Sequence, residues 1–67
     1  MPALTQEERN TLACATVSAI EEVYAVEDHR WLQPVRRYYK YDATDEELIA
    51  GHANWTAARD KLERAEA

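Results

Sequence analysis

The chain has 67 residues, 13 acidic and 8 basic side chains, and a formal net charge of −5. This length allows one domain at most, here residues 1–67, and the acidic balance excludes a general nucleic-acid coat because phosphate neutralisation needs a basic face. Only eleven residues are Leu, Ile or Val, so we expect a small core that a second copy or another protein completes.

A first helix is predicted over residues 6–28, extending to Leu32 at most. Thr5 and Glu8 form a capping box, in which each side chain satisfies a free backbone N–H of the first turn. On a helical wheel the apolar side chains form two neighbouring rows, which together are wider than one packing partner needs. The first row is Leu12, Thr16, Ala19, Val23 and Val26, and the second is Ala13, Val17, Ile20 and Tyr24. We therefore predict two packing partners for this helix.

Residues 29–44 connect this helix to the next one. Sixteen residues are too many for a structureless connection inside so small a domain. Pro34 suits the first position of a helix, where its missing N–H is not needed. The sequence therefore predicts a short third helix over residues 34–41.

A second long helix is predicted over residues 45–65, because Thr44 and Glu47 repeat the capping box. Its apolar and small side chains follow the 3-4 spacing of a coiled-coil seam, which consists of Leu48, Gly51, Trp55, Ala58, Leu62 and Ala65. Gly51 is the only glycine of the chain, and its place on the seam predicts a close backbone approach by a neighbouring helix. The alternative is a helix that breaks at Gly51 and restarts after Asn54.

The predicted fold is all-α: an antiparallel hairpin of helices at about 6–28 and 45–65, joined by a short helical or irregular segment. The simplest assembly is a homodimer that forms a four-helix bundle, with the twin subunit on the second row of the first helix. The alternative is a monomer in which the connecting segment covers that row itself.

The residue types that common active sites need are scarce. One glycine excludes phosphate-binding loops, and Ser18, the only serine, lies in the middle of a predicted helix. Cys14, His29 and His52 lack the spacing typical of a nucleophile pair or a metal site. We therefore expect no enzymatic activity, no cofactor and no metal. The single cysteine, the lack of a secretory signal pattern and the lack of a run of about 18 apolar residues predict a cytoplasmic protein that does not enter membranes.

Residues 29–41 differ from the rest of the chain, since they hold four of the eight Lys and Arg, four of the six aromatic residues and no acid. Exposed Arg, Tyr and Trp are typical of binding hot spots. We therefore favour a non-enzymatic regulatory or adaptor protein that binds another protein of unknown identity. Its binding residues would be Arg30, Trp31, Arg36, Arg37, Tyr38, Tyr39 and Tyr41. The structural alternative places the apolar side chains of this segment over the helix pair, namely Trp31, Leu32, Val35 and two tyrosines. In this alternative the basic side chains face the acidic helices; these are Arg30, Arg36, Arg37 and Lys40.

Two other functions fit the sequence. Small acidic helical chains are common among bacterial and phage accessory proteins, and some of these inhibit nucleic-acid-binding proteins by presenting carboxylates in place of phosphates. The corresponding residues here would be Glu21, Glu22, Asp45, Glu46 and Glu47. The second alternative is contact of residues 29–41 with single-stranded nucleic acid, in which rings stack on bases and arginines bind phosphates. The 13 acidic residues of the chain oppose such a contact.

Overall fold

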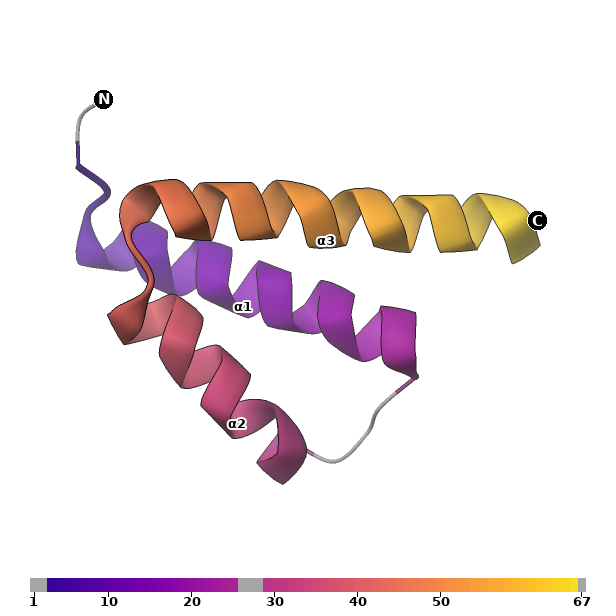
Figure 1. Cartoon of the computed structure of the whole chain (residues 1–67), viewed down its shortest axis with the longest axis horizontal. Helices are drawn as coiled ribbons and strands as arrows, with labels where there is room; N and C mark the ends of the chain where they lie inside the picture. Colours follow the sequence, from indigo (N-terminus) through magenta and orange to yellow (C-terminus); the bar gives the residue numbers. More distant parts are fainter. Residues whose placement is uncertain (1–2, 26–28, 67) are drawn as a thin grey trace.

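A computed structural model gives the structure of the chain for residues 3–25 and 29–66. These residues form three α-helices and no strand, so the all-α prediction is confirmed for them (Figure 1). Helix α1 is Gln6–Tyr24, α2 is His29–Arg37 and α3 is Asp45–Glu66. A π-helical turn, η1, at Tyr38–Asp42 continues α2. Within the described residues no helix is both long enough and apolar enough to cross a membrane.

The helices α1 and α3 lie side by side and run in the same direction (Figure 1). Arg9, in the first turn of α1, forms an ion pair with Asp45, the first residue of α3. Toward the other ends, the carboxylate of Glu22 in α1 lies 3.5 Å from Nε of Arg59 in α3. The predicted antiparallel hairpin is therefore wrong. The physical reason is that α2 and η1 together form a helical connection of residues 29–42, which is long enough to return the chain along α1 before α3 begins.

The predicted starts of the two long helices are confirmed. At α1, the N–H of Glu8 donates to the hydroxyl of Thr5 at 3.1 Å, and the N–H of Thr5 donates to the carboxylate of Glu8 at 2.9 Å. At α3, the N–H of Glu47 donates to the hydroxyl of Thr44 at 3.1 Å, and the N–H of Thr44 donates to the carboxylate of Glu47 at 3.0 Å. Each start is thus specified by four consecutive residues, which is why the sequence alone located it.

Helix α1 ends at Tyr24, before the predicted boundary, and residues 26–28 lie outside the described residues. Ala25 caps the helix in the left-handed region, with φ 53° and ψ 41°. There its N–H donates to the carbonyls of Glu21 and Glu22. Glycine usually takes this position, because a Cβ costs about 1–2 kcal/mol in the left-handed region. The sequence has alanine instead, and so the end of the helix was not predicted.

Replacing Ala25 by glycine is expected to stabilise the chain by about 0.5–1 kcal/mol, since glycine has no Cβ that the left-handed conformation strains. The midpoint of urea unfolding measures this change. The matched control is Ala53→Gly, at an exposed position inside α3, which should destabilise by about 1 kcal/mol because glycine is a poor helix former. A lower midpoint for Ala25→Gly would show that the helix does not end at this residue.

The central segment is helical, as its length indicated, but its predicted boundaries are wrong. Helix α2 begins at His29, so Pro34 lies inside the helix and not at its first position. A proline there removes one helical hydrogen bond. The helix forms nevertheless, because its apolar side packs on the core: Leu32 is fully buried and Val35 packs against the buried cluster.

The core lies where α1 meets the two other helices. The buried cluster and the residues packed against it are Val17, Ile20, Leu32, Val35, Tyr39 and Trp55. The prediction of two packing partners for α1 is confirmed, since α1 contacts both α3 and α2–η1. The second partner is therefore the chain's own central segment, and α1 does not need a twin subunit to bury its second row.

Helix α3 is continuous through Gly51, so the alternative with a break at this residue is wrong. A Cβ at Gly51 would lie 2.6 Å from Cε1 of Tyr39, which means that an aromatic ring, and not the backbone of a neighbouring helix, makes the close approach. The predicted seam is buried only in its first half: Leu48 is fully buried, Trp55 is half-buried and Leu62 is 36% exposed. The reason is visible in Figure 1, where the last turns of α3 extend beyond the end of α1.

Candidate functional site

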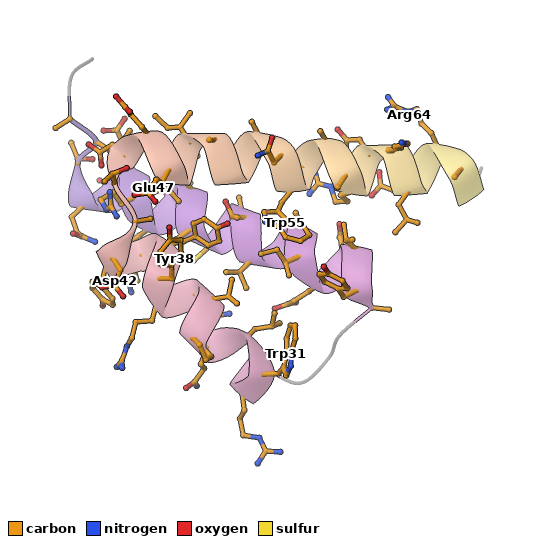
Figure 2. All side chains as sticks on the ribbon, viewed as in Figure 1. Trp31, Tyr38, Asp42, Glu47, Trp55 and Arg64 are labelled. Carbon is orange, nitrogen blue, oxygen red and sulfur yellow. The ribbon has the colours of Figure 1, made fainter. Side chains whose placement is uncertain are left out.

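An apolar groove of about 440 Å³ is lined by side chains of α2–η1 and α3 and by two side chains of α1. Five of the six aromatic side chains of the chain line it. Figure 2 labels Trp31 and Tyr38 on the α2–η1 side and Trp55 on the α3 side. We call this surface the aromatic groove, and its lining residues are Ile20, Tyr24, Trp31, Pro34, Val35, Tyr38, Tyr39 and Trp55.

Tyr24 connects the two tryptophans of the groove. Its ring centroid lies 6.4 Å from that of Trp31 at an interplanar angle of 68°, and 5.7 Å from that of Trp55 at 55°. Such tilted and edge-on ring pairs are favourable by about 0.5–1.5 kcal/mol each beyond their burial, so the rings hold one another in place. Even so, Tyr24 is 58% exposed and Trp31 is 57% exposed. Large apolar side chains that pack on one another yet remain open to water are typical of binding surfaces.

Two tyrosines form the η1 end of the aromatic groove. The hydroxyl of Tyr38 donates to the carboxylate of Glu47 at 2.9 Å, and the rings of Tyr38 and Tyr39 pack edge-on with centroids 5.1 Å apart. The hydrogen bond to the Glu47 carboxylate is the main cause that raises the pKa of Tyr38. The pKa of Glu47 is lowered, first by the N–H of Thr44 and then by the Tyr38 hydroxyl. The hydrogen bond therefore fixes Tyr38 between the central segment and α3.

A second surface, the basic face, lies on another side of α2–η1 and encloses a shallow hollow of about 560 Å³. Its residues are Arg30, Gln33, Pro34, Arg36, Arg37, Lys40, Tyr41 and Asp42. Arg36 and Arg37 are exposed, and neither forms an ion pair with any residue of the described ranges. Pairing of these two arginines with the acidic helices, one part of the structural alternative, is thus not found among the described residues. The apolar part of that alternative is confirmed for Leu32, which is buried, and for Val35 and Tyr39, which pack against the buried cluster. Pro34 lines both the basic face and the aromatic groove, so the two surfaces adjoin.

The turn η1 ends the central segment with a widened helical turn. The N–H of Ala43 donates to the carbonyl of Tyr38, five residues earlier, at 2.7 Å. Turns of this kind insert one residue into a helix and are frequent at functional sites. Here the turn places Tyr38 and Tyr39 against α3, which the hydrogen bond to Glu47 and the contact with Gly51 demonstrate.

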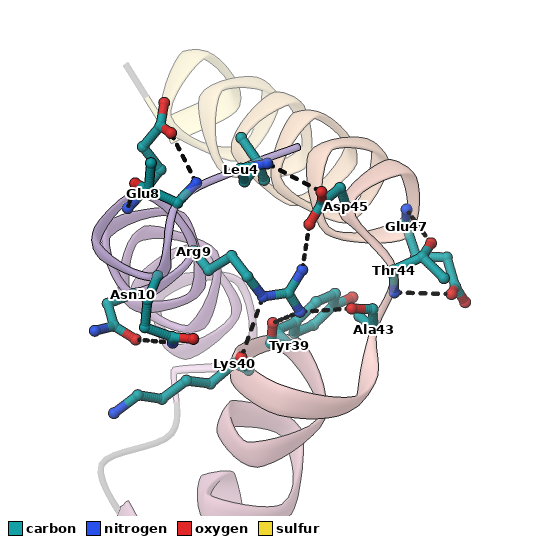
Figure 3. A network of polar contacts seen from close by, with 12 residues as sticks. Leu4, Glu8, Arg9, Asn10, Tyr39, Lys40, Ala43, Thr44, Asp45 and Glu47 are labelled. Atoms are coloured by element: carbon teal, nitrogen blue, oxygen red, sulfur yellow. Dashed lines mark hydrogen bonds and ion pairs between the residues drawn. The ribbon is translucent and has the colours of Figure 1, made fainter. Parts of the chain in front are cut away.

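Arg9 of α1 holds this end of the segment in place (Figure 3). Its guanidinium donates to the carbonyls of Tyr39 at 3.3 Å, Lys40 at 3.4 Å and Ala43, and forms the ion pair with Asp45. The side chain of Arg9 is only 13% exposed. The last carbonyls of a helix have no partner within the helix, and the planar fork of an arginine can serve several of them at once. Arg9 thus joins α1, η1 and α3.

Acid is expected to weaken this junction. The pKa of Asp45 lies below its ordinary value of 3.8, first because its carboxylate accepts the N–H of Leu4 and then because of Arg9. The unfolded chain therefore takes up the proton first, so the stabilisation is present above about pH 3.8 and is lost as the pH falls through the lower folded value. Melting temperatures of the unchanged chain and of Asp45→Asn should converge on acidification below about pH 4. A difference that stays constant down to about pH 2 would contradict the lowered pKa.

The structure divides the seven predicted binding residues between the two surfaces. Three of them line the aromatic groove: Trp31, Tyr38 and Tyr39. The other four line the basic face: Arg30, Arg36, Arg37 and Tyr41. The sequence did not predict Tyr24, Pro34 or Trp55 as part of a surface. The sequence pattern places Tyr24 and Trp55 in the packed rows of their helices, and the direction of α3 brings the two rings together.

The carboxylates predicted for a nucleic-acid mimic do not form one free row. Asp45 pairs with Arg9, Glu47 caps α3 and accepts from Tyr38, and Glu22 pairs with Arg59. The remaining two are Glu21, which is half-buried, and Glu46, which is exposed. Most of these acids therefore stabilise the fold itself.

The sequence carries a signal for Arg9 that the predicted sites do not include. Arg9 is the only basic residue among residues 1–28, which hold six acids. It lies one residue after the capping box, on a helix whose other charges are negative. A lone arginine in such a place indicates a specific acceptor, although the sequence does not show which one.

The described residues contain no group of three or more His, Cys, Asp or Glu side chains that could hold a metal ion. Cys14 is a free and exposed thiol. Comparison of the chain with protein-family models, with curated proteins and with solved structures finds no match in any of the three, so its function is inferred from the aromatic groove and the basic face alone.

Proposed function

We propose that the chain is a non-enzymatic regulatory or adaptor protein that binds a protein partner through the aromatic groove and the basic face. The observation that supports this most is the pair of adjoining surfaces at Pro34, one lined with open aromatic rings and the other with exposed arginines. Trp, Tyr and Arg are the residues enriched in binding hot spots. Tyr39 of this segment packs against the buried cluster, but Trp31 is 57% exposed and Arg37 has no ion pair within the described residues, so core packing and ion pairing do not account for these two side chains.

A protein segment fits these surfaces better than a small ligand does. Small-molecule sites are concave and bury most of the ligand. Here the rings form an open groove, and the arginines lie outside it on a neighbouring face. One protein segment can cover the groove and contact the basic face at the same time, which gives both apolar burial and charge pairing.

The two other functions receive less support. The carboxylates that a nucleic-acid mimic would present at residues 22, 45 and 47 are engaged in bonds within the chain. For single-stranded nucleic acid, the rings and most of the arginines lie on different surfaces. The phosphate of a nucleotide whose base stacks in the aromatic groove would then lie away from most of the basic side chains of the basic face.

The test is an affinity measurement with three variants. A partner captured on the unchanged chain is purified, and its dissociation constant is measured with Trp31→Ala, Arg37→Ala and Arg64→Ala. We expect each of the first two to weaken binding by roughly 30-fold or more, the effect of losing a hot spot of about 2 kcal/mol. Arg64, labelled in Figure 2 near the far end of α3, is the charge-matched control and should have no effect. Equal loss with all three variants, or no loss with any, would contradict the proposal.

We also propose a homodimer, but not the four-helix bundle expected from the sequence, because α2 already covers α1. The apolar surface left for a twin subunit is the last part of the α3 seam, where Leu62 is 36% exposed. Sedimentation equilibrium should then show a dimer that Leu62→Glu dissociates. A mass near 7.7 kDa for the unchanged chain at millimolar concentration would contradict the dimer.

A further inference from the structure

The walls of the aromatic groove determine which kind of backbone can fill it. Every lining residue belongs to α1, α2, η1 or α3, so the groove has no strand edge within the described residues. A segment in extended conformation usually binds by adding hydrogen bonds to such an edge. The groove presents only side chains, which is the situation in which an amphipathic helix places its apolar side into a groove between helices.

The spacing of the groove residues also matches a helical ligand. On the α2–η1 side, Trp31, Val35 and Tyr38 follow one another at intervals of four and three residues. They therefore form a ridge about two turns long, roughly 10 Å at 1.5 Å per residue. Trp55 forms the facing wall on α3. A helix with apolar residues at positions i, i+3 or i+4, and i+7 places a row of the same length between the two walls.

The charged side chains beside the aromatic groove indicate which residues a bound helix carries on its flank. Pro34 lies at the border between the groove and the basic face, and Arg37 lies three residues after it, on the same side of the helix. Arg37 is exposed and has no ion pair within the described residues. Asp42 is the only acid among the residues that line the basic face. A partner helix in the groove therefore meets a positive border, although the chain as a whole has a net charge of −5.

The helices of a second copy do not fit this description. The apolar rows of α1 contribute Val17 and Ile20 to the core and are not available. The last turns of α3 expose Leu62, but the bases Lys61 and Arg64 flank it as closely as acids do. Charge complementarity thus favours another protein over a twin subunit as the occupant of the groove.

We infer that the partner segment is an amphipathic helix of another protein, with apolar residues at helical spacing in the aromatic groove and carboxylates along the edge that faces Arg37. This inference rests on the proposed function and adds the chemistry of the partner. The apolar row gives affinity through burial, and the carboxylates fix the direction and register of the helix on α2.

The experiment is a selection from a displayed library of random peptides of about 16 residues, a length that allows four helical turns. The full chain, Arg37→Glu and Trp31→Ala serve as three separate baits, with Arg64→Glu as the control for a charge reversal outside the site. We expect the unchanged chain and Arg64→Glu to select the same peptides, with apolar residues at i, i+3 or i+4, and i+7 and with Asp or Glu on one flank. Arg37→Glu should instead select Lys or Arg at that flank, and it should bind the acidic peptides at least about 30-fold more weakly. Trp31→Ala should select neither group.

The outcomes separate the inference from the proposed function. Peptides that are helical but uncharged or basic, selected by the unchanged chain and lost with Trp31→Ala, would overturn the inference and leave the protein-binding function in place. No selection above background by the unchanged chain would overturn both. A labelled oligothymidine that binds the unchanged chain, and that Trp31→Ala and Arg37→Glu both release, would overturn both in favour of single-stranded nucleic acid.

Discussion

Replacing Arg9 by methionine is expected to destabilise the chain by about 2–4 kcal/mol, the largest effect that we expect of a single substitution in this fold. Methionine keeps most of the length of the side chain but removes its donors. The carbonyls of Tyr39, Lys40 and Ala43 then lose their partner, and the carboxylate of Asp45 loses its ion pair. Single domains are stable by only about 5–15 kcal/mol, and one of this size lies near the lower limit, so the loss is a large fraction of the total. Urea unfolding followed by circular dichroism measures it.

Two further substitutions identify the cause. Arg64→Met, near the end of α3, removes an exposed charge and should change the stability by less than about 0.5 kcal/mol. Arg9→Lys keeps the charge but not the planar fork, and a single ammonium cannot reach three carbonyls and a carboxylate together. We therefore expect Arg9→Lys to be nearly as unstable as Arg9→Met. A lysine variant as stable as the unchanged chain would mean that charge alone is needed at this position.

Replacing Gly51 by leucine is expected to destabilise the chain by about 1–3 kcal/mol, although leucine forms helices better than glycine does. A Cβ at this position would lie 2.6 Å from Cε1 and 2.9 Å from Oη of Tyr39, closer than such atoms approach. The ring of Tyr39 packs against the buried cluster, so moving it disturbs the core as well. The smaller change Gly51→Ala should be destabilising too, because the overlap begins at Cβ.

A double-mutant cycle tests this explanation. In a background of Tyr39→Ala the ring is absent, and Gly51→Ala should then stabilise the chain by up to about 1 kcal/mol through helix propensity. The sign of the effect thus reverses between the two backgrounds, with a coupling of about 1–3 kcal/mol. The control is Ala50→Gly, at the exposed neighbouring position, whose effect should be the same in both backgrounds. A stabilising Gly51→Ala in the unchanged chain would show that the ring moves aside freely.

The parts of the fold that could be predicted from the sequence are those determined by neighbouring residues. The boxes at Thr5 and Thr44 each act within one helical turn, and both helix starts were correct. The helical character of the central segment followed from its length, although its start did not, and the two apolar rows of α1 correctly indicated two partners. In each case the physical cause lies within a few residues of the feature.

The errors concern features determined over long distances or by an unusual residue. Ala25 takes a conformation that glycine normally takes, and Pro34 occurs inside a helix that tertiary packing stabilises. The direction of α3 relative to α1 depends on the length and direction of α2–η1, which connects the two helices. No pattern of neighbouring residues in the sequence predicts this direction. For the second row of α1, the structure agrees with the alternative in which the connecting segment covers it, and not with the twin subunit that the sequence favoured.

The candidate site was predicted in part for the same reason. The composition of residues 29–41 indicated the segment that supplies most of the residues lining the aromatic groove and the basic face, because an excess of Arg and aromatic residues is visible without a structure. It did not show that the rings and the charges separate into two surfaces, since this depends on which side of α2 faces the core. Tyr24 and Trp55 complete the groove from other helices and lie far from the segment in sequence.

The parallel arrangement of α1 and α3 also has a consequence for the order of events during folding. A helical hairpin can close progressively from its turn, but here the first contact between α1 and α3 joins residues far apart, such as Arg9 and Asp45, which are separated by 36 positions. Closing so long a loop costs conformational entropy before the native contacts can compensate for it. Folding rates therefore fall as contacts between residues far apart in the sequence dominate a fold. Individual helices form within about a microsecond, so the docking of α3 should limit the rate. During synthesis on the ribosome, the apolar sides of α1 and α2 are therefore expected to stay incompletely covered until α3 emerges.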